Sequence, residues 1–541
     1  MMDVKAHQEE ISEEMSLAAW IGLFLGPVCL LFCLLTQAPA GMTNEAWHTV
    51  GITLLMAIWW ATEAIPIPAT SLLPVLLVPM LHIGSLKSAT TPYGSPTVFL
   101  FMGGFILGLA MQRWNLHKRI ALLTLRMMGS KPKNQIAGFM MATAFISMWV
   151  SNTATTIMML PIGLSIIGLV AGEDRGTENE RERFATALLL GIAYAASIGG
   201  MATLIGTPPN ATLVAYLREK DIHIGFGQWM IVGVPVSISL LAFTWWWLTR
   251  KKFALTGQGS DALIKGELDK LGPMSGAEKK VALVFVAAAL AWMFQPLIAT
   301  VLPSVNDTSI AMAAALSLFL IPVDARKRVF LMNWKYGSSL PWGILLLFGG
   351  GLSLANAIEA SKLAEWIAVN LEVLQVLPVF LMMGIVVLVI VFLTEVTSNT
   401  ATAATFLPLI GAVAIAQGIP PTVLAVPVAL AASCAFMLPV ATPPNAIVFS
   451  TGHMHISSMI RAGMALNVYS TIVLTLICYY LAIPVLTGKP EETQPPLEEP
   501  QQQQVLSPQS SENRTDIPQQ LTALGDFPGG MKPGWAVGVQ K

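Results

Sequence analysis

Charged residues are scarce in this 541-residue chain, where Asp, Glu, Lys and Arg together make up 11% of the sequence. A soluble globular protein carries about 25% charged residues, so this chain could not cover itself with a hydrated surface. Hydrophobic residues reach 54%, and several uncharged runs attain the roughly 18 residues that indicate a membrane-spanning helix. Three such runs stand at 17–35, 281–298 and 466–486. The composition therefore predicts an all-α polytopic membrane protein.

Cysteine is also scarce, and its placement excludes most of its chemistry. The four cysteines lie in apolar segments without metal-ligand spacing or pairing in loops, which favours small buried side chains over disulfides or redox groups. His453 and His455 follow the end of a span and have no ligand partners nearby in the sequence. A membrane subunit of a dehydrogenase would need paired histidines for haem or cysteine clusters within its spans. Neither is present, so the sequence disfavours an enzyme.

The few positive residues set the predicted orientation. Lys and Arg are concentrated in the loops 113–133, 250–280 and 326–335, whereas 37–46 and 301–308 have none. Positive loops favour the cytoplasm, and the N-terminus then lies on the same side. The following organisation is expected: a cytoplasmic segment 1–16, an extra first span within 17–46, a first repeat 47–249, a cytoplasmic linker 250–280, a second repeat 281–487, and a disordered tail 488–541 rich in Pro, Gln and Glu.

Two polar motifs each occur twice within the apolar segments. "SNTATT" from Ser151 returns as "SNTATA" from Ser398, and "GTPPNA" from Gly206 returns as "ATPPNA" from Ala441. Upstream, "MGGFILGLA" is echoed by "FGGGLSLA" in the same order and at nearly the same separation, which indicates an internal duplication. With the basic loops inside, equivalent spans of the two copies cross the membrane in opposite directions. Inverted repeats with a site near the midplane are a recurring plan of secondary transporters.

Each SNT motif lies near the middle of an apolar stretch too long for one span, at 134–172 and 374–417. About 17 residues on either side would climb roughly 25 Å as helix. We therefore expect two re-entrant helical hairpins that turn at SNT and approach each other from opposite faces. At their tips, Asn152 and Asn399 would begin or end helices, and the free backbone N–H groups at helix N-termini attract anions.

The proline pairs after the hairpins predict broken helices. Proline removes a hydrogen-bond donor and interrupts a helix, so "TPP" at 207–209 and 442–444 frees carbonyl oxygens that suit a cation such as sodium. Lys and Arg are absent from all four motifs, so an anion would be held by amides, hydroxyls and helix ends, with bound cations neutralising it. Titratable groups in the pathway are few. Only Glu395 and Glu63 qualify, and both are read as structural or supporting residues, which favours sodium over proton coupling.

The paired SNT motifs, the paired TPP breaks and "WWATEAIPIPATSLLP" resemble the divalent anion/sodium symporter family, which includes dicarboxylate and citrate carriers. The resemblance covers roughly residues 15–487. It implies about eleven spans with two re-entrant hairpins in inverted repeats. It also implies a homodimer in which each protomer has a scaffold domain and a transport domain that moves like an elevator.

The resemblance further implies which residues bind the cargo. One sodium ion would contact Ser147, Ser151, Asn152 and Gly206, and a second would contact Thr394, Thr397, Asn399 and Ala441. The dicarboxylate would contact Asn152, Thr153, Thr207, Ser398, Asn399, Thr400, Thr442 and Pro443. Citrate-preferring relatives can have Gly at the first motif position, so Ser151 favours succinate, fumarate and malate. Some relatives have Ser in place of Thr207, which keeps the hydroxyl.

The expected function is sodium-coupled import of C4-dicarboxylates by alternating access across the cell (inner or plasma) membrane. Sodium would be co-transported, and the partners would be the dicarboxylate, the lipid bilayer and a second copy of the chain. Three alternatives stay open at this point. The same fold could serve a dicarboxylate exchanger or a citrate or sulfate carrier, a membrane subunit of an enzyme is the second alternative, and a channel is the third.

Overall fold

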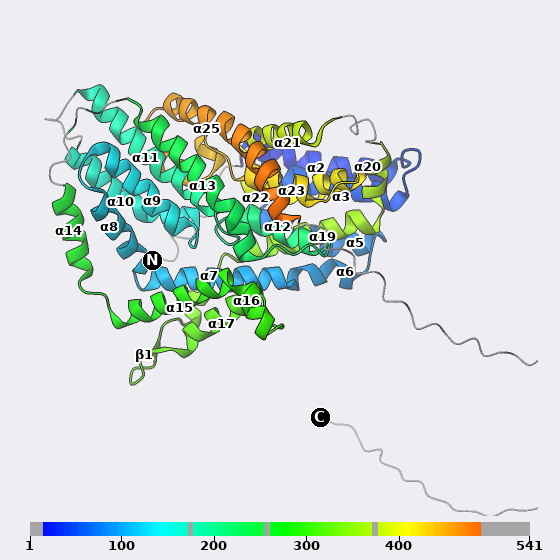
Figure 1. Ribbon diagram of the computed structural model, residues 1–541. Coiled ribbons are helices and arrows are strands. Elements are labelled where there is room, and N and C mark those ends of the chain that lie inside the picture. Colours follow the sequence, from blue (N-terminus) through cyan, green and yellow to red (C-terminus); the bar gives the residue numbers. More distant parts are fainter. Residues whose placement is uncertain are drawn as a thin grey trace, which may run out of the picture. The chain divides into compact units, whose positions relative to one another are not determined.

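The computed structural model of the protein describes residues 15–170, 177–251, 253, 255, 260–370 and 377–487 (Figure 1). Helices make up most of this part, and its only strands are the short antiparallel pair β1 (Pro322–Asp324) and β2 (Val329–Phe330). Most of the predicted N-terminal segment and the whole predicted tail, 488–541, lie outside the described residues. The all-α prediction therefore holds for the described chain apart from this pair.

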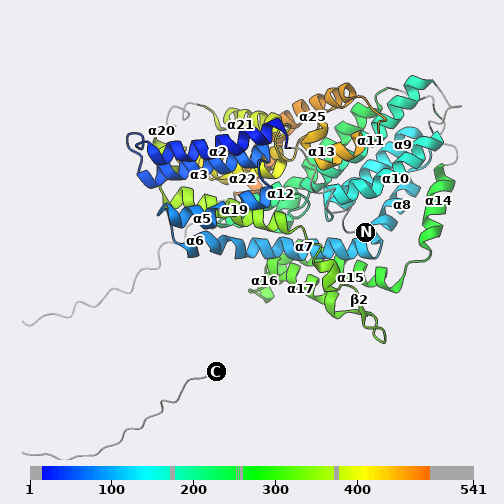
Figure 2. The same cartoon turned by 180° about the vertical axis from the view of Figure 1, so that it is seen from behind.

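The chain starts with two long helices that pack against each other, α2 (Leu17–Leu35) and α3 (Asn44–Thr62), seen together in Figure 2. The apolar run near 69–85 would suggest one span, but prolines interrupt the sequence repeatedly, and the chain forms short helices there instead. These are α4 (Ile67–Thr70), α5 (Leu73–Met80), α6 (Leu86–Thr90) and the 3₁₀ turn η1 (Thr91–Gly94), and they lead into α7 (Pro96–Arg113).

The next six helices contain the first pair of motifs: α8 (Leu116–Met128), α9 (Pro132–Ser147), α10 (Asn152–Val170), α11 (Glu178–Met201), α12 (Pro208–Arg218) and α13 (Phe226–Thr249). Helix α10 begins at the Asn of SNT, and α12 begins at the first Pro of TPP. Proline is favoured at a first helical position, where its missing N–H is not needed. The predicted hairpin 134–172 thus corresponds to α9 and α10, which pack against each other.

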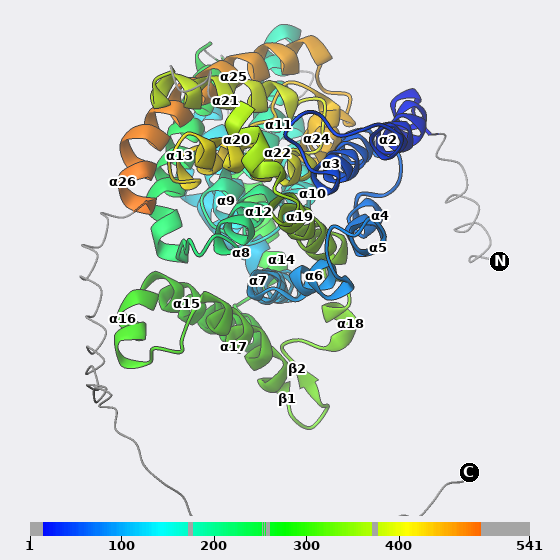
Figure 3. The same ribbon diagram turned by 90° about the vertical axis from the view of Figure 1, so that its right-hand side faces the viewer.

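A helix that the sequence did not predict, α14 (Ser260–Leu271), lies in the expected linker 250–280. It is followed by α15 (Gly276–Met293), α16 (Gln295–Val301), α17 (Asp307–Leu320) and α18 (Trp334–Gly337). Figure 3 shows α15 and α17 side by side, with α17 against α7. Helices α15 and α16 are bent by 78° at the break between them, where Pro296 directly follows the first residue of α16.

The second pair of motifs lies in the remaining helices: α19 (Trp342–Ala360), α20 (Leu363–Asn370), α21 (Val379–Leu393), α22 (Asn399–Ala416), α23 (Thr422–Ala432), η3 (Pro439–Ala441), α24 (Pro443–Phe449) and α25 (Ile456–Ile477), which η4 (Cys478–Ala482) and α26 (Ile483–Leu486) continue. As in the first half, α22 begins at the Asn of SNT and α24 begins at the first Pro of TPP. The motifs therefore mark the same helix boundaries twice.

In the described residues, eight helices are long and apolar enough to cross a membrane, or nine if α15 and α16 count as one bent span. Four shorter apolar helices accompany them. Large apolar side chains face outward, including Leu17 and Leu35, each 77% exposed, as expected of a surface that lipid covers. The protein is a multi-pass membrane protein. The eleven spans implied by the resemblance stay a prediction.

The two halves pack reciprocally across the motifs. Helix α12, which follows the first TPP, contacts α22, which follows the second SNT, and α10 likewise contacts α24. Contact between α12 and α22 is close, since a Cβ on Gly411 would lie 1.8 Å from the Tyr216 hydroxyl. Each proline-initiated helix is thus supported by the hairpin of the other half, and this arrangement brings the motif-bearing helices together.

Candidate functional site

The first hairpin is tied to the helix that breaks at TPP. Ser147, the last residue of α9, is fully buried, and its hydroxyl donates to the Ala196 carbonyl on α11 at 2.6 Å. The Asn152 side chain lies 2.6 Å from the same hydroxyl. With its amide nitrogen turned toward these groups, Asn152 also donates to the carbonyls of Ala196 at 3.1 Å and Gly206 at 3.3 Å. One asparagine at the hairpin tip therefore joins both sides of the break.

Two glycines allow this close approach. A Cβ on Gly200 would lie 2.7 Å from the Gly206 carbonyl oxygen and 2.8 Å from the Asn152 side-chain amide. No side chain fits at that position without movement of the backbone. The structure thus assembles Ser147, Asn152 and Gly206, three of the four residues predicted for the first cation. The fourth, Ser151, is exposed, and its hydroxyl accepts from the Ala154 N–H at 3.3 Å.

The second hairpin repeats the arrangement with a threonine. The buried Thr394 hydroxyl donates to the Ala432 carbonyl at the end of α23 at 2.9 Å, and it lies 2.8 Å from Asn399 Oδ1. Thr394 and Asn399 therefore correspond to Ser147 and Asn152, each hydroxyl linking a hairpin asparagine to a carbonyl near a break. The duplication read from the motifs extends to this hydrogen-bonded geometry.

The other two residues predicted for the second cation lie less close to this pair. The Thr397 hydroxyl is 2.6 Å from that of Thr402 and donates to the Leu393 carbonyl at 3.0 Å. Ala441 is buried at the end of η3, and its N–H donates to the Leu438 carbonyl at 3.2 Å. Within the described residues, no hydrogen bond joins Ala441 to the Thr394–Asn399 pair, in contrast to the link from Asn152 to Gly206.

The residues predicted for the dicarboxylate lie at four helix starts. Thr207 and Thr442 are the buried N-cap residues of α12 and α24, and the Thr442 hydroxyl accepts from the Asn445 N–H at 3.3 Å. Ser398 is the N-cap of α22. The remaining members are the partly buried Asn152, Thr153, Asn399 and Thr400 in the first turns of α10 and α22, and the exposed Pro443.

Sequence reasoning did not single out the asparagine that ends each TPPN motif. The Asn210 amide donates to the carbonyls of Thr203 at 2.8 Å and Met201 at 3.2 Å. The equivalent Asn445 donates to the carbonyls of Leu438 at 3.1 Å and Ala435 at 3.2 Å. Both asparagines donate to carbonyls beside the helix breaks. The signal was available, since this Asn is the fourth letter of the duplicated motif.

The chemistry of these loops is that of neutral oxygen and N–H groups. Hydroxyl, amide and carbonyl oxygens suit hard cations, and the described residues contain no cluster of three His, Cys, Asp or Glu side chains that could hold a transition metal. The N-termini of α10 and α22 supply N–H donors and a partial positive charge for an anion. The arrangement can therefore bind cations and an anion together without a basic side chain.

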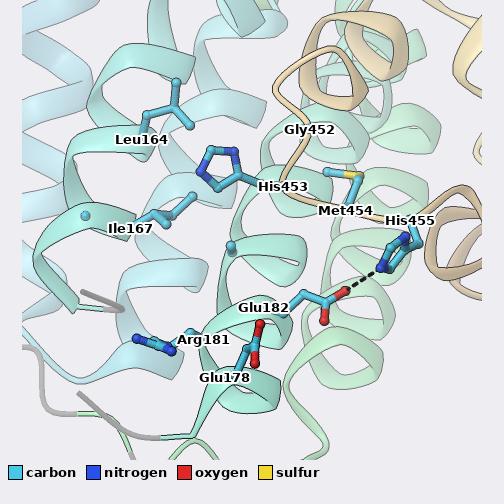
Figure 4. A pocket seen from close by; sticks show the side chains of 11 residues that line it. Leu164, Ile167, Glu178, Arg181, Glu182, Gly452, His453, Met454 and His455 are labelled. Atoms are coloured by element: carbon cyan, nitrogen blue, oxygen red, sulfur yellow. Dashed lines mark ion pairs between the residues drawn. The ribbon is translucent and has the colours of Figure 1, made fainter. Parts of the chain in front are cut away.

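One cavity, of about 600 Å³, lies away from these loops (Figure 4). Its lining includes Arg181, Glu182, His453 and His455, and His455 Nε2 lies 3.4 Å from Glu182 Oε1. None of its lining residues belongs to the predicted substrate or cation sets. We therefore place the candidate site at the duplicated loops, whose chemistry suits both cations and an anion, despite the size of this cavity.

Duplicated helix breaks beside duplicated polar motifs, within a bundle of apolar helices, are typical of a membrane transporter. The chain belongs to the family described as the sodium:sulfate symporter transmembrane region, whose sequence profile matches residues 17–486. The resemblance inferred from the motifs is therefore confirmed. The family consists of transporters, which also confirms the prediction that the chain is not an enzyme.

Curated relatives cover most of the chain. A protein of Staphylococcus aureus (strain bovine RF122 / ET3-1) named sodium-dependent dicarboxylate transporter SdcS is 43% identical over 478 residues, 86% of this chain and 92% of that protein. The protein of the same name from Staphylococcus saprophyticus is 42% identical over 477 residues, with the same coverage. The solved structure of Neisseria gonorrhoeae MtrF, titled as one of a class of antimetabolite efflux pumps, covers 89% of this chain and 99% of its own, with a TM-score of 0.52 and 12% identity. The likeness to MtrF is one of fold alone.

Proposed function

We propose that the chain is a secondary active transporter that imports C4-dicarboxylates, namely succinate, fumarate and malate, together with sodium by alternating access. The observation that carries the proposal is the duplicated link from a buried hydroxyl to a hairpin asparagine and to a carbonyl at a helix break, made by Ser147 with Asn152 and by Thr394 with Asn399. The family and the names of the two staphylococcal relatives support both the sodium and the dicarboxylate.

In this proposal, each half supplies one cation set. The first set is Ser147, Ser151, Asn152 and Gly206, and the second is Thr394, Thr397, Asn399 and Ala441. Each sodium ion would be held by hydroxyl, amide and carbonyl oxygens. Because the asparagine belongs to both the cation set and the substrate set, a bound cation would orient its amide toward the substrate.

The dianionic substrate would lie between the two helix-start regions. Its carboxylates would meet the N–H groups and hydroxyls of Asn152, Thr153 and Thr207 from one half, and those of the remaining set from the other: Ser398, Asn399, Thr400, Thr442 and Pro443. Uncompensated charge is costly in a low-dielectric site. Sodium binding would lower that cost, which couples the substrate to the cation.

The finer architecture is part of the same proposal. We infer that α9–α10 and α21–α22 are re-entrant hairpins of two inverted repeats, 47–249 and 281–487, in a fold of about eleven spans. The N-terminus would be cytoplasmic and the protein a homodimer in the cell membrane, with an elevator-like motion of its transport domain. The reciprocal packing of α12 on α22 and α10 on α24 supports one body that contains both cation sets.

The test is uptake of labelled succinate by proteoliposomes with an inward sodium gradient, compared with an inward choline gradient. We expect uptake that depends on sodium and saturates in both ions. Uptake that ignores sodium and requires internal dicarboxylate would indicate an exchanger, and uptake that does not saturate would indicate a channel. Competition by unlabelled citrate and sulfate tests those two alternatives as substrates.

A further inference from the structure

The break between α23 and η3 differs from the break between α11 and α12 because a buried carboxylate, that of Glu395, contacts its backbone. Between α23 and η3 the backbone is unwound at residues 434–438, where residues 434–436 are buried and residues 437 and 438 are partly buried. Buried backbone N–H groups need acceptors. Glu395 supplies them: its Oε1 accepts from Phe436 at 2.7 Å and Met437 at 2.9 Å, and its Oε2 accepts from Met437 at 3.0 Å and Leu438 at 3.2 Å.

A fourth donor group completes the shell of this carboxylate. The side-chain amide of Asn467, on α25, donates to Glu395 Oε1 at 2.7 Å. Glu395 is only 3% exposed, and both of its oxygens face donors. A protonated carboxyl would direct its own hydrogen toward one of these N–H groups, so the contacts favour the ionised form, which only accepts hydrogen bonds.

Two other helices, α11 and α25, also contact the unwound segment. The buried Tyr194 hydroxyl, from α11, donates to the Phe436 carbonyl at 2.7 Å. Gly463 of α25 lies directly on the segment, since a Cβ there would be 2.3 Å from the same carbonyl oxygen. Asn467 follows four residues later on the same face of α25. The N–H groups of this segment therefore donate to Glu395, its Phe436 carbonyl accepts from Tyr194, and α25 packs against it.

The first half has the same scaffold without the charge. On α13, a Cβ on Gly233 would lie 2.7 Å from the Met201 carbonyl oxygen, and Ser237, four residues later, donates to the Ile198 carbonyl at 2.8 Å. Gly233 and Ser237 therefore correspond to Gly463 and Asn467. Alignment of the two SNT motifs places Met148 at the position of Glu395. The first half therefore has no carboxylate at this position.

In the first half, a neutral hydrogen bond takes the place of the carboxylate: Thr203 Oγ1 donates to the Met148 carbonyl at 2.5 Å.

This difference between the halves matters because an ionised carboxylate in a membrane protein is costly unless its charge is compensated. No Lys, Arg or His of the described chain forms an ion pair with Glu395. The segment that it holds continues within three residues to Ala441, whose N–H donates to the Leu438 carbonyl.

We propose that Glu395 is a positioning residue for the second cation: it holds residues 436–438, the segment that leads to Ala441 of the second cation set, and its negative charge favours a cation there. The inference rests on the proposed sodium coupling and adds that the two cation sites are unequal. The second-half site is the one with a carboxylate at its helix break. Loss of Glu395 should therefore weaken sodium binding more than substrate binding.

The test compares the wild-type protein with Glu395→Gln in proteoliposomes. We expect the sodium concentration for half-maximal succinate uptake to rise by about tenfold or more, as for loss of hydrogen bonds to a charged group. The KM for succinate, measured at saturating sodium, should change far less. A second readout uses detergent-solubilised protein, where bound sodium raises Tm by mass action. The sodium-induced rise in Tm should be smaller in Glu395→Gln than in the wild type.

Two variants separate positioning from general damage. Glu359→Gln removes a carboxylate that pairs with Lys220 at the surface, and it should keep the wild-type sodium dependence. Asn467→Ala removes one neutral donor to Glu395, and it should shift the sodium dependence in the same direction as Glu395→Gln but less. If Glu395→Gln does not fold, this second variant decides the question.

The outcomes are distinct for the two levels of inference. A wild-type protein that ignores sodium would overturn the proposed function. Sodium-dependent wild-type uptake, combined with an unshifted sodium response in Glu395→Gln, would overturn only the role of Glu395, as would an unshifted response in Asn467→Ala if the first variant is unstable. A KM for succinate that rises as much as the half-saturating sodium concentration would also reject a specific role in cation binding.

Discussion

A Cβ atom on Gly206 would lie 2.5 Å from the carbonyl oxygen of Gly200. The two glycines face each other across the first helix break, and the Gly206 carbonyl is within reach of the Asn152 amide. A methyl group at either position would force the two backbones apart. This contact therefore fixes how near the hairpin tip comes to the carbonyls of the break.

We predict that Gly206→Ala reduces sodium-dependent succinate uptake by at least about tenfold, because even a shift of about 1 Å at a binding geometry can be that costly. Uptake should be normalised to the amount of inserted protein. The matched control is Gly168→Ala on α10, where nothing lies within 4 Å of the added methyl. Equal uptake by the two variants would contradict the assignment of Gly206 to the site.

Asn152→Ala and Asn399→Ala should each abolish sodium-driven uptake without loss of membrane insertion. Each asparagine sits at a duplicated hairpin tip and contacts a buried hydroxyl. Uptake and surface labelling of the same preparations provide the measurement. Normal transport by both variants would remove these residues from the proposed site.

Thr394→Val should weaken the sodium dependence of uptake, whereas Thr394→Ser should preserve it. Valine keeps the shape but leaves the Ala432 carbonyl and the Asn399 side chain without their shared hydroxyl, a loss of about 1 to 3 kcal/mol for a buried polar group. Serine is the residue at the equivalent position 147. The half-saturating sodium concentration of the two variants checks this, and identical values for both would contradict it.

Glu278→Gln should lower thermal stability while leaving substrate affinity unchanged. Arg119 Nε on α8 lies 2.8 Å from Glu278 Oε1 at the start of α15, and both side chains are largely buried. Breaking one partner of a buried pair costs about 3 to 5 kcal/mol. Tm in detergent is the measurement, with Glu359→Gln as the control for an exposed pair. A Tm loss no larger than that of the control would show that the pair contributes little.

His455→Gln should leave uptake within about twofold of the wild type, a change of less than 0.5 kcal/mol. The His455–Glu182 contact lines the cavity of Figure 4, outside the predicted site. Succinate uptake and its KM are the quantities to compare. A raised KM for succinate would place this cavity on the substrate path.

The sequence predicted features that local chemistry determines. Asn152 and Asn399 were expected to begin or end helices, and they begin α10 and α22; the proline pairs were expected to break helices, and α12 and α24 begin at the first Pro of each TPP. The hydrogen-bond partners of Glu395 could not be predicted in this way. They lie 41 to 72 residues further along the chain, and only tertiary packing brings them to the carboxylate.

Other differences have the same origin. The bend between α15 and α16 and the short helices from α4 to η1 depend on how prolines are accommodated by neighbouring helices. Helix α14 lies in a region that composition marks only as a polar connection. Asn210 and Asn445 were visible in the motif, but their carbonyl partners exist only because the preceding helices unwind.

The reciprocal packing of α12 on α22 and of α10 on α24 has a consequence for how such a protein could arise. A repeat expressed alone would lack the helix of the other copy that packs against its proline-initiated helix, so each copy contributes to the packing of the other. With the inverted repeats proposed above, an ancestral single repeat, before duplication and fusion, would have assembled as an antiparallel pair. Once the copies were joined, each was free to diverge, and the carboxylate now found in only one of them is a difference that an identical pair could never have acquired.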